Sequence, residues 1–67
     1  MKVFIIKKNE SMLTFNIVKD IKTLNGMINR VKQYPKEKGK ETTYHIYETN
    51  ENDIFKDNER YLTSVTV

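Results

Sequence analysis

One stretch of helical periodicity, residues 21–34, constrains the fold more than any other feature of this sequence. Apolar side chains recur there at spacings of three and four residues, which places them on one stripe of a helix. They are Ile21, Leu24, Met27, Ile28, Val31 and Tyr34. Asp20 is the expected N-cap, and Pro35 ends the helix because the residue before a proline disfavours helical geometry. The chain therefore offers one helix with one apolar face.

Two segments with β-strand character precede the helix. Residues 2–8 form a short apolar run with lysines at both ends. Residues 12–18 alternate, with Leu13, Phe15 and Ile17 on one side and Thr14 and Asn16 on the other. Alternation of this kind is typical of a strand with one buried face. We predict two consecutive strands.

Two further strand-like segments follow the helix. A charged loop at 35–41 leads into residues 42–48, and the last segment, 60–67, is again rich in β-branched residues. Between them, residues 50–58 are dense in Asn and Asp around one apolar pair, Ile54 and Phe55, which indicates a loop or a short helical turn.

The order β-β-α-β-β predicts an α+β fold over residues 1–67 as a single domain. One helix packs on a four-stranded, mostly antiparallel sheet, as a small two-layer sandwich. If the helix crosses over so that 42–48 lies beside 2–8, the strand order is second, first, third, fourth. The helix would then pack Ile21, Leu24, Ile28 and Val31 on Leu13, Phe15 and Ile17.

Composition excludes several classes of protein. Sixty-seven residues without cysteine form no disulfide, and one histidine cannot build a zinc site alone. No apolar run approaches the roughly 18 residues of a membrane span, and the first ten residues lack the features of a signal peptide. We expect a cytoplasmic protein with no metal site, no cofactor and no membrane contact. The chain lacks alanine and is rich in Lys, Asn and Ile, which is typical of AT-rich bacterial and phage genomes.

The second face of the predicted sheet has no helix to cover it. Thr43, His45 and Tyr47 fall on one side of the third strand, and Tyr61 belongs to the fourth. Three interpretations are open: a face partly shielded by the 50–58 loop, a protein-protein surface, or a platform on which bases of single-stranded nucleic acid stack. His45, Tyr47 and Tyr61 are the candidate partner-binding residues.

Positive charge is concentrated in the first part of the chain. Residues 1–40 have ten Lys or Arg and three acids, a balance of +7, whereas residues 41–67 have two and six, a balance of −4. The candidate nucleic-acid-binding residues are Arg30, Lys32, Lys36, Lys38 and Lys40. Clustered cations contact phosphates, but lysines near a helix C-terminus also complement the helix dipole and keep a small protein soluble.

Residues for catalysis are sparse, and we expect no enzyme. The sequence has no cysteine nucleophile, no glycine-rich phosphate loop and no calcium-loop spacing in its acidic segment. Small basic RNases use sparse sets of His, Arg, Tyr and Lys on sheets, so His45, Tyr47 and Arg60 are the candidates for that activity.

The preferred hypothesis is a small non-enzymatic binding or regulatory module. It would act through protein-protein contact at the open sheet face, with a different protein or a second copy of the chain. It could be an accessory protein of a phage or mobile element that modulates a host protein. Nucleic-acid binding by the 30–40 segment is the first alternative, and a toxin-like RNase is the second.

Overall fold

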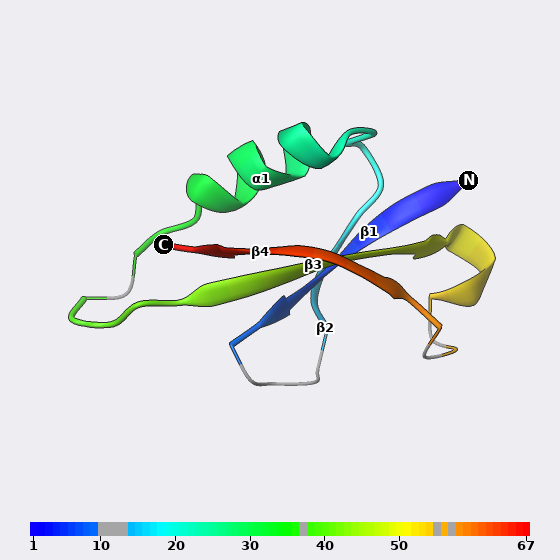
Figure 1. Cartoon of the computed structure of the whole chain (residues 1–67). Coiled ribbons are helices and arrows are strands. Elements are labelled where there is room, and N and C mark those ends of the chain that lie inside the picture. Colours follow the sequence, from blue (N-terminus) through cyan, green and yellow to red (C-terminus); the bar gives the residue numbers. More distant parts are fainter. Residues whose placement is uncertain (10–13, 37, 55, 57) are drawn as a thin grey trace.

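The computed structural model describes residues 1–9, 14–36, 38–54, 56 and 58–67. In chain order its elements are β1 (Lys2–Lys8), β2 (Thr14–Val18), α1 (Leu24–Lys32), β3 (Thr43–Asn50), the 3-10 helix η1 (Glu51–Asp53) and β4 (Arg60–Thr66). The four strands form one antiparallel sheet in the order β2-β1-β3-β4, and α1 lies across one face of it (Figure 1). The predicted α+β sandwich and its strand order are confirmed.

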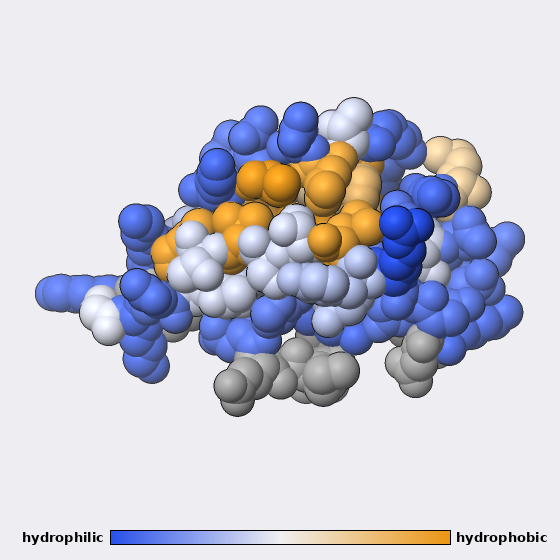
Figure 2. Space-filling model, in the orientation of Figure 1, coloured by the Kyte–Doolittle hydropathy of each residue, from blue (hydrophilic) through white to orange (hydrophobic). Residues whose placement is uncertain are grey.

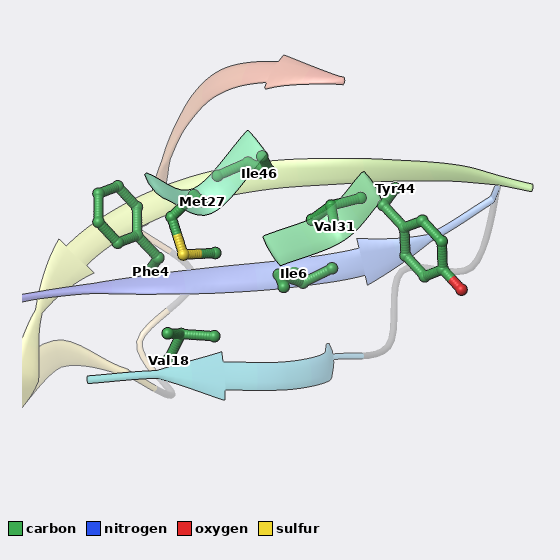
Figure 3. Packing of buried hydrophobic residues seen from close by; sticks show 7 residues of the cluster. All are labelled: Phe4, Ile6, Val18, Met27, Val31, Tyr44 and Ile46. Atoms are coloured by element: carbon green, nitrogen blue, oxygen red, sulfur yellow. The ribbon is translucent and has the colours of Figure 1, made fainter. Parts of the chain in front are cut away.

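The hydrophobic core lies between α1 and the sheet face that α1 covers, which we call the inner face. Met27 and Val31 of α1 are fully buried there against Ile6 of β1 and Ile46 of β3 (Figure 3). Phe4, Val18 and Tyr44 complete the buried cluster. Burial of each such side chain contributes about 1.5–3 kcal/mol, so this cluster is the main source of stability.

The helix begins later than the sequence predicted. Thr23 is the N-cap, and its Oγ1 accepts a hydrogen bond from the Gly26 backbone N–H at 3.1 Å. The expectation that Asp20 caps the helix is therefore wrong. Asp20 instead accepts a hydrogen bond from Arg30 at 3.1 Å, which ties the segment entering the helix to its last turn. The helix also ends earlier than predicted, at Lys32, so that Tyr34 lies beyond it although it packs on the core.

Gly26 has a steric reason to be glycine. A Cβ atom at this position would lie 2.8 Å from Cγ2 of Ile21 and 3.1 Å from Oγ1 of Thr23. The chain that enters α1 therefore folds back closely against the first turn. The close contacts of Gly26 are thus with Ile21, which precedes the helix, and with the capping residue Thr23.

Two β-bulges, one in β2 and one in β4, change the direction of the side chains that follow them. In β2 the register skips Phe15, so that Ile17 pairs with Ile5 on the side away from α1, while Asn16 and Val18 pair with the inner-face Ile6 and Phe4. The prediction that Ile17 packs against the helix is therefore wrong, and Leu13 lies outside the described residues. In β4 the register skips Leu62, which packs on the core as Val65 does, whereas Tyr61 lies on the opposite face.

The sheet face away from α1, which we call the outer face, is partly covered by the chain itself. Val3 and Ile5 of β1 are only 2% and 1% exposed although they point away from the helix. Residues 58 and 59, which we call the covering segment, contact this face. Thr49 Oγ1 donates a hydrogen bond to Asn58 Oδ1 at 3.3 Å, and Lys7 forms an ion pair with Glu59. The apolar side chains of β1 are therefore buried on both faces of the sheet. Ile54 is half-buried, and Phe55 lies outside the described residues.

Candidate functional site

The strongest cluster of polar and aromatic side chains lies on the outer face over β3 and β4. We call it the outer-face cluster and define it as Lys7, His45, Tyr47, Tyr61 and Ser64. The register explains the grouping, because Lys7 is opposite His45 in β1–β3, while Ser64 is opposite His45 and Tyr61 opposite Tyr47 in β3–β4. The three residues predicted to bind a partner thus lie in one cluster.

A chain of hydrogen bonds fixes the histidine. His45 Nε2 lies 2.8 Å from the backbone oxygen of Asn9, which can only accept. In the neutral ring we therefore assign the proton to Nε2, which leaves Nδ1 to accept from Ser64 Oγ at 2.6 Å. Ser64 in turn accepts from the Tyr61 hydroxyl at 2.7 Å. Each polar group in this chain has a partner, so the cluster is rigidly organised.

Aromatic contacts hold the two tyrosines. The Tyr47 and Tyr61 rings meet edge to face with 5.5 Å between centroids, and Lys7 Nζ lies 4.9 Å from the centre of the Tyr47 ring. Edge-to-face and cation–π geometries of this kind are favourable. Tyr61 remains 53% exposed, whereas His45 and Tyr47 are half-buried. Tyr61 is therefore an ordered aromatic ring that faces solvent.

Lys7 joins the cluster to the covering segment. Its Nζ is 2.5 Å from Glu59 Oε1, and the two side chains are 9% and 10% exposed. The hydrogen bond from Lys7 lowers the pKa of the Glu59 carboxyl below its ordinary value, with a smaller contribution from a backbone hydrogen bond. The pair anchors the chain just before β4 and places one positive charge beside Tyr47.

Arg60 does not join the cluster. Its guanidinium lies 3.7 Å from Glu48, which also pairs with Lys2 at 3.6 Å. Glu48 is opposite the inner-face residue Phe4, so Arg60 pairs toward the other side of the sheet from His45. The three residues named for an RNase are therefore not brought together. Ser64, His45 and the backbone carbonyl of Asn9 are hydrogen-bonded in succession. This arrangement resembles a nucleophile, its base and the group that orients the base.

The candidate nucleic-acid-binding residues lie at the end of α1 and in the loop before β3, at the opposite end of the molecule from the start of β4 (Figure 1). Arg30 is half-buried and paired with Asp20, so it faces away from the lysine loop. Lys32, Lys36, Lys38 and Lys40 are exposed at the end of α1 and in the loop before β3. Within the described residues these four lysines have no ion-pair partner.

A small hollow lies near the amino end of β1 and the entry to α1. Its volume is about 220 Å³, below the roughly 300–1,000 Å³ of typical ligand pockets. Its lining residues are Met1, Lys2, Phe4, Ile21, Lys22 and Glu48. It opens on the inner side of the sheet, away from the outer-face cluster.

The described residues contain no group of three or more His, Cys, Asp or Glu side chains placed to hold a metal ion. In the same part of the chain, no helix has both the length and the apolar character needed to cross a membrane. Comparisons with known proteins gave no assignment: no family model, no curated protein and no solved structure matches the chain.

Proposed function

We propose that this chain is a non-enzymatic protein-binding module whose contact surface is the outer-face cluster. The observation that carries the proposal is Tyr61, an aromatic side chain that is exposed yet fixed on two sides, by the Tyr47 ring and by Ser64. A pre-ordered tyrosine loses little rotamer freedom on binding and provides a large apolar area with a polar tip. Such residues are enriched among the anchors of protein interfaces.

The surroundings of Tyr61 support a polar rim around this anchor. On one side Lys7 forms its nearly buried ion pair with Glu59, and on the other Ser64 and Thr66 provide hydroxyls. Charges at the rim of an interface mainly determine partner choice and the rate of association. The Lys-, Asn- and Ile-rich composition supports an origin in an AT-rich bacterium or phage, and we infer a cytoplasmic accessory protein that binds a larger host protein.

The test places a photo-crosslinking amino acid at position 61 in cells that naturally express the chain, with Asn25, an exposed α1 residue, as the control position. We expect a discrete crosslinked partner from position 61 alone. With that partner purified, Tyr61→Ala should weaken binding at least about tenfold, equal to 1.4 kcal/mol. Phe15→Ala is a matched control, since Phe15 is 48% exposed but contacts the inner-side rings of Tyr34 and Tyr44. Equal losses from both variants would contradict the proposal.

Nucleic-acid binding is the second candidate function, and the four exposed lysines without an ion-pair partner in the described residues are the observation in its favour. Phosphate contacts of this kind predict affinity that falls steeply as salt rises from about 50 to 200 mM. Fluorescence anisotropy with single- and double-stranded probes measures this. No binding at the lower salt concentration would remove the alternative.

A further inference from the structure

The two edges of the sheet differ in how they are protected. The β2 edge is five residues long and interrupted by the bulge at Phe15, and the backbone N–H of Ile17 donates to the Asn16 side chain at 2.9 Å. Short length, bulges and occupied N–H groups are devices that stop an edge strand from pairing with another chain. The β2 edge is therefore closed to further strands.

The β4 edge lacks these devices beyond its first residues. The bulge lies at Leu62, and the sequence from 61 to 67, YLTSVTV, contains no charged residue, no proline and no glycine. The other edge strand, β2, is also uncharged, so what distinguishes the two edges is the shorter length of β2 and the bulge within it. Uncharged runs of high β propensity readily add a further strand. Within the described residues, β4 pairs with β3 alone.

The ladder identifies the backbone groups that point outward. Val67 and Thr42 exchange both backbone hydrogen bonds, at 2.9 and 3.0 Å. In an antiparallel ladder such pairs alternate with pairs whose N–H and C=O groups point away from each other. The register then makes Thr66–Thr43 and Ser64–His45 the outward-pointing pairs. Ser64 and Thr66 thus present their backbone groups at the free edge.

An apolar strip runs beside this edge. Leu62, Val65 and Val67 of the last segment are only half-buried, and Ile28 and Leu24 of α1 are also incompletely covered. Figure 2 shows apolar side chains gathered between the helix and the strands on this side of the molecule. A strand added to β4 would cover them with its own inner-face residues.

We propose that the occupant of the β4 edge is β4 of a second copy, so that two chains share a continuous eight-stranded antiparallel sheet. With the two-fold axis at Val65, Ser64 of each copy pairs with Thr66 of the other, and the two Val65 side chains meet on the inner face beside α1. The uncharged run makes this self-pairing free of like-charge contacts. The two Arg60 residues would lie about 34 Å apart at 3.4 Å per residue, well beyond the roughly 8 Å screening length.

The first test is the mass in sedimentation equilibrium across a range of concentrations. We expect the 8.0 kDa chain to approach twice that mass as concentration rises. Thr66→Pro should weaken the dimer at least tenfold, because it removes an outward N–H that a partner strand needs but no bond to β3. Thr66→Val is the control, since it also loses the 3.0 Å hydroxyl contact with Thr43 but keeps the N–H. A chain that stays monomeric, or a dimer insensitive to Thr66→Pro, would overturn the proposal.

The second test uses the absence of native cysteine. Val65→Cys should form an intermolecular disulfide across the two-fold axis in a glutathione redox buffer, whereas Asn25→Cys on the exposed side of α1 should not. Equal oxidation at both positions would contradict this pairing, even if Thr66→Pro fails to fold. Tyr61→Lys should leave the dimer intact, because Tyr61 projects from the outer face. A dimer lost with Tyr61→Lys but not with Thr66→Pro would instead place self-association at the outer-face cluster.

Discussion

At the scale of single residues, the ion pair between Lys7 and Glu59 connects two parts of the chain that are 52 positions apart in the sequence. Lys7 lies in β1, a central strand of the sheet, and Glu59 lies in the covering segment just before β4. Both side chains are nearly inaccessible, so a change to either leaves a poorly solvated charge. The covering of the outer face therefore depends on the charge of one carboxylate.

We predict that Glu59→Gln lowers the free energy of unfolding by about 1.5 kcal/mol at pH 7, in the range for hydrogen bonds to charged groups. The hydrogen bond from Lys7 lowers the pKa of Glu59 in the folded chain. The stabilisation is therefore complete above the ordinary carboxyl pKa, about 4.3, and is lost as the pH falls through the lowered value. Urea denaturation of both proteins between pH 7 and pH 2 measures the difference.

A matched control is Glu51→Gln, which removes the exposed pair with Lys19 at 3.9 Å. That change should alter stability by less than about 0.5 kcal/mol, as for most surface pairs. A Glu59→Gln deficit that persists unchanged at pH 2 would show that the carboxylate charge is not its source.

Sequence reasoning selected His45, Tyr47 and Tyr61, and the fold does place them together. It did not find Ser64, Asn9 or Lys7 as their partners. Ser64 lies 19 positions from His45 and Asn9 lies 36 positions away, so their contacts exist only once the strands are in register.

At the scale of elements, periodicity predicted the helix, the four strands and their order. The predicted direction of Ile17 in β2 was wrong because that strand contains a bulge at Phe15, whereas Tyr61 of β4 does lie on the outer face as predicted. At a bulge, two residues of one strand lie opposite a single residue of the partner strand. This one extra residue moves every later side chain of the bulged strand to the other face of the sheet. Nothing in TFNIV or in YLTSVT marks the extra residue by its chemistry. Phe15 and Leu62 are ordinary strand residues, and only pairing with β1 and β3 reveals their role.

The start of α1 gives a direct test of the observed cap against the expected one. Thr23→Ala should lower the free energy of unfolding by about 1 kcal/mol, because the first-turn N–H of Gly26 loses its acceptor. Asp20→Ala removes an exposed ion pair with Arg30 and should cost less than about 0.5 kcal/mol. Thermal or urea denaturation of the two variants compares them. A larger loss from Asp20→Ala would restore Asp20 as the residue that holds the helix start.

At the scale of the whole molecule, the two central strands of the sheet are more completely paired and buried than the two edge strands. β1 and β3 are hydrogen-bonded on both sides, β1 is buried on both faces and β3 on its inner face, whereas β2 and β4 are edges. Stability is therefore concentrated in two strands that are far apart in the sequence.

We expect amide hydrogen exchange to follow this arrangement. The amides of Ile5, Ile6 and Ile46 should exchange last, through global unfolding, and those of β2 and the covering segment should exchange earlier through local opening. Exchange followed by NMR at low protein concentration measures the order. Protection of α1 that outlasts that of β1 would contradict it.

The central ladder between β1 and β3 also bears on how the chain folds during synthesis. The shortest link in that ladder joins Lys8 to Tyr44, and the longest joins Lys2 to Asn50. Contacts between such distant positions slow folding, because the loop must close before they form. On the ribosome, β1 and β2 emerge as a hairpin that lacks its main partner. The apolar run of β1 therefore stays unpaired on one side until β3, residues 43–50, has been translated.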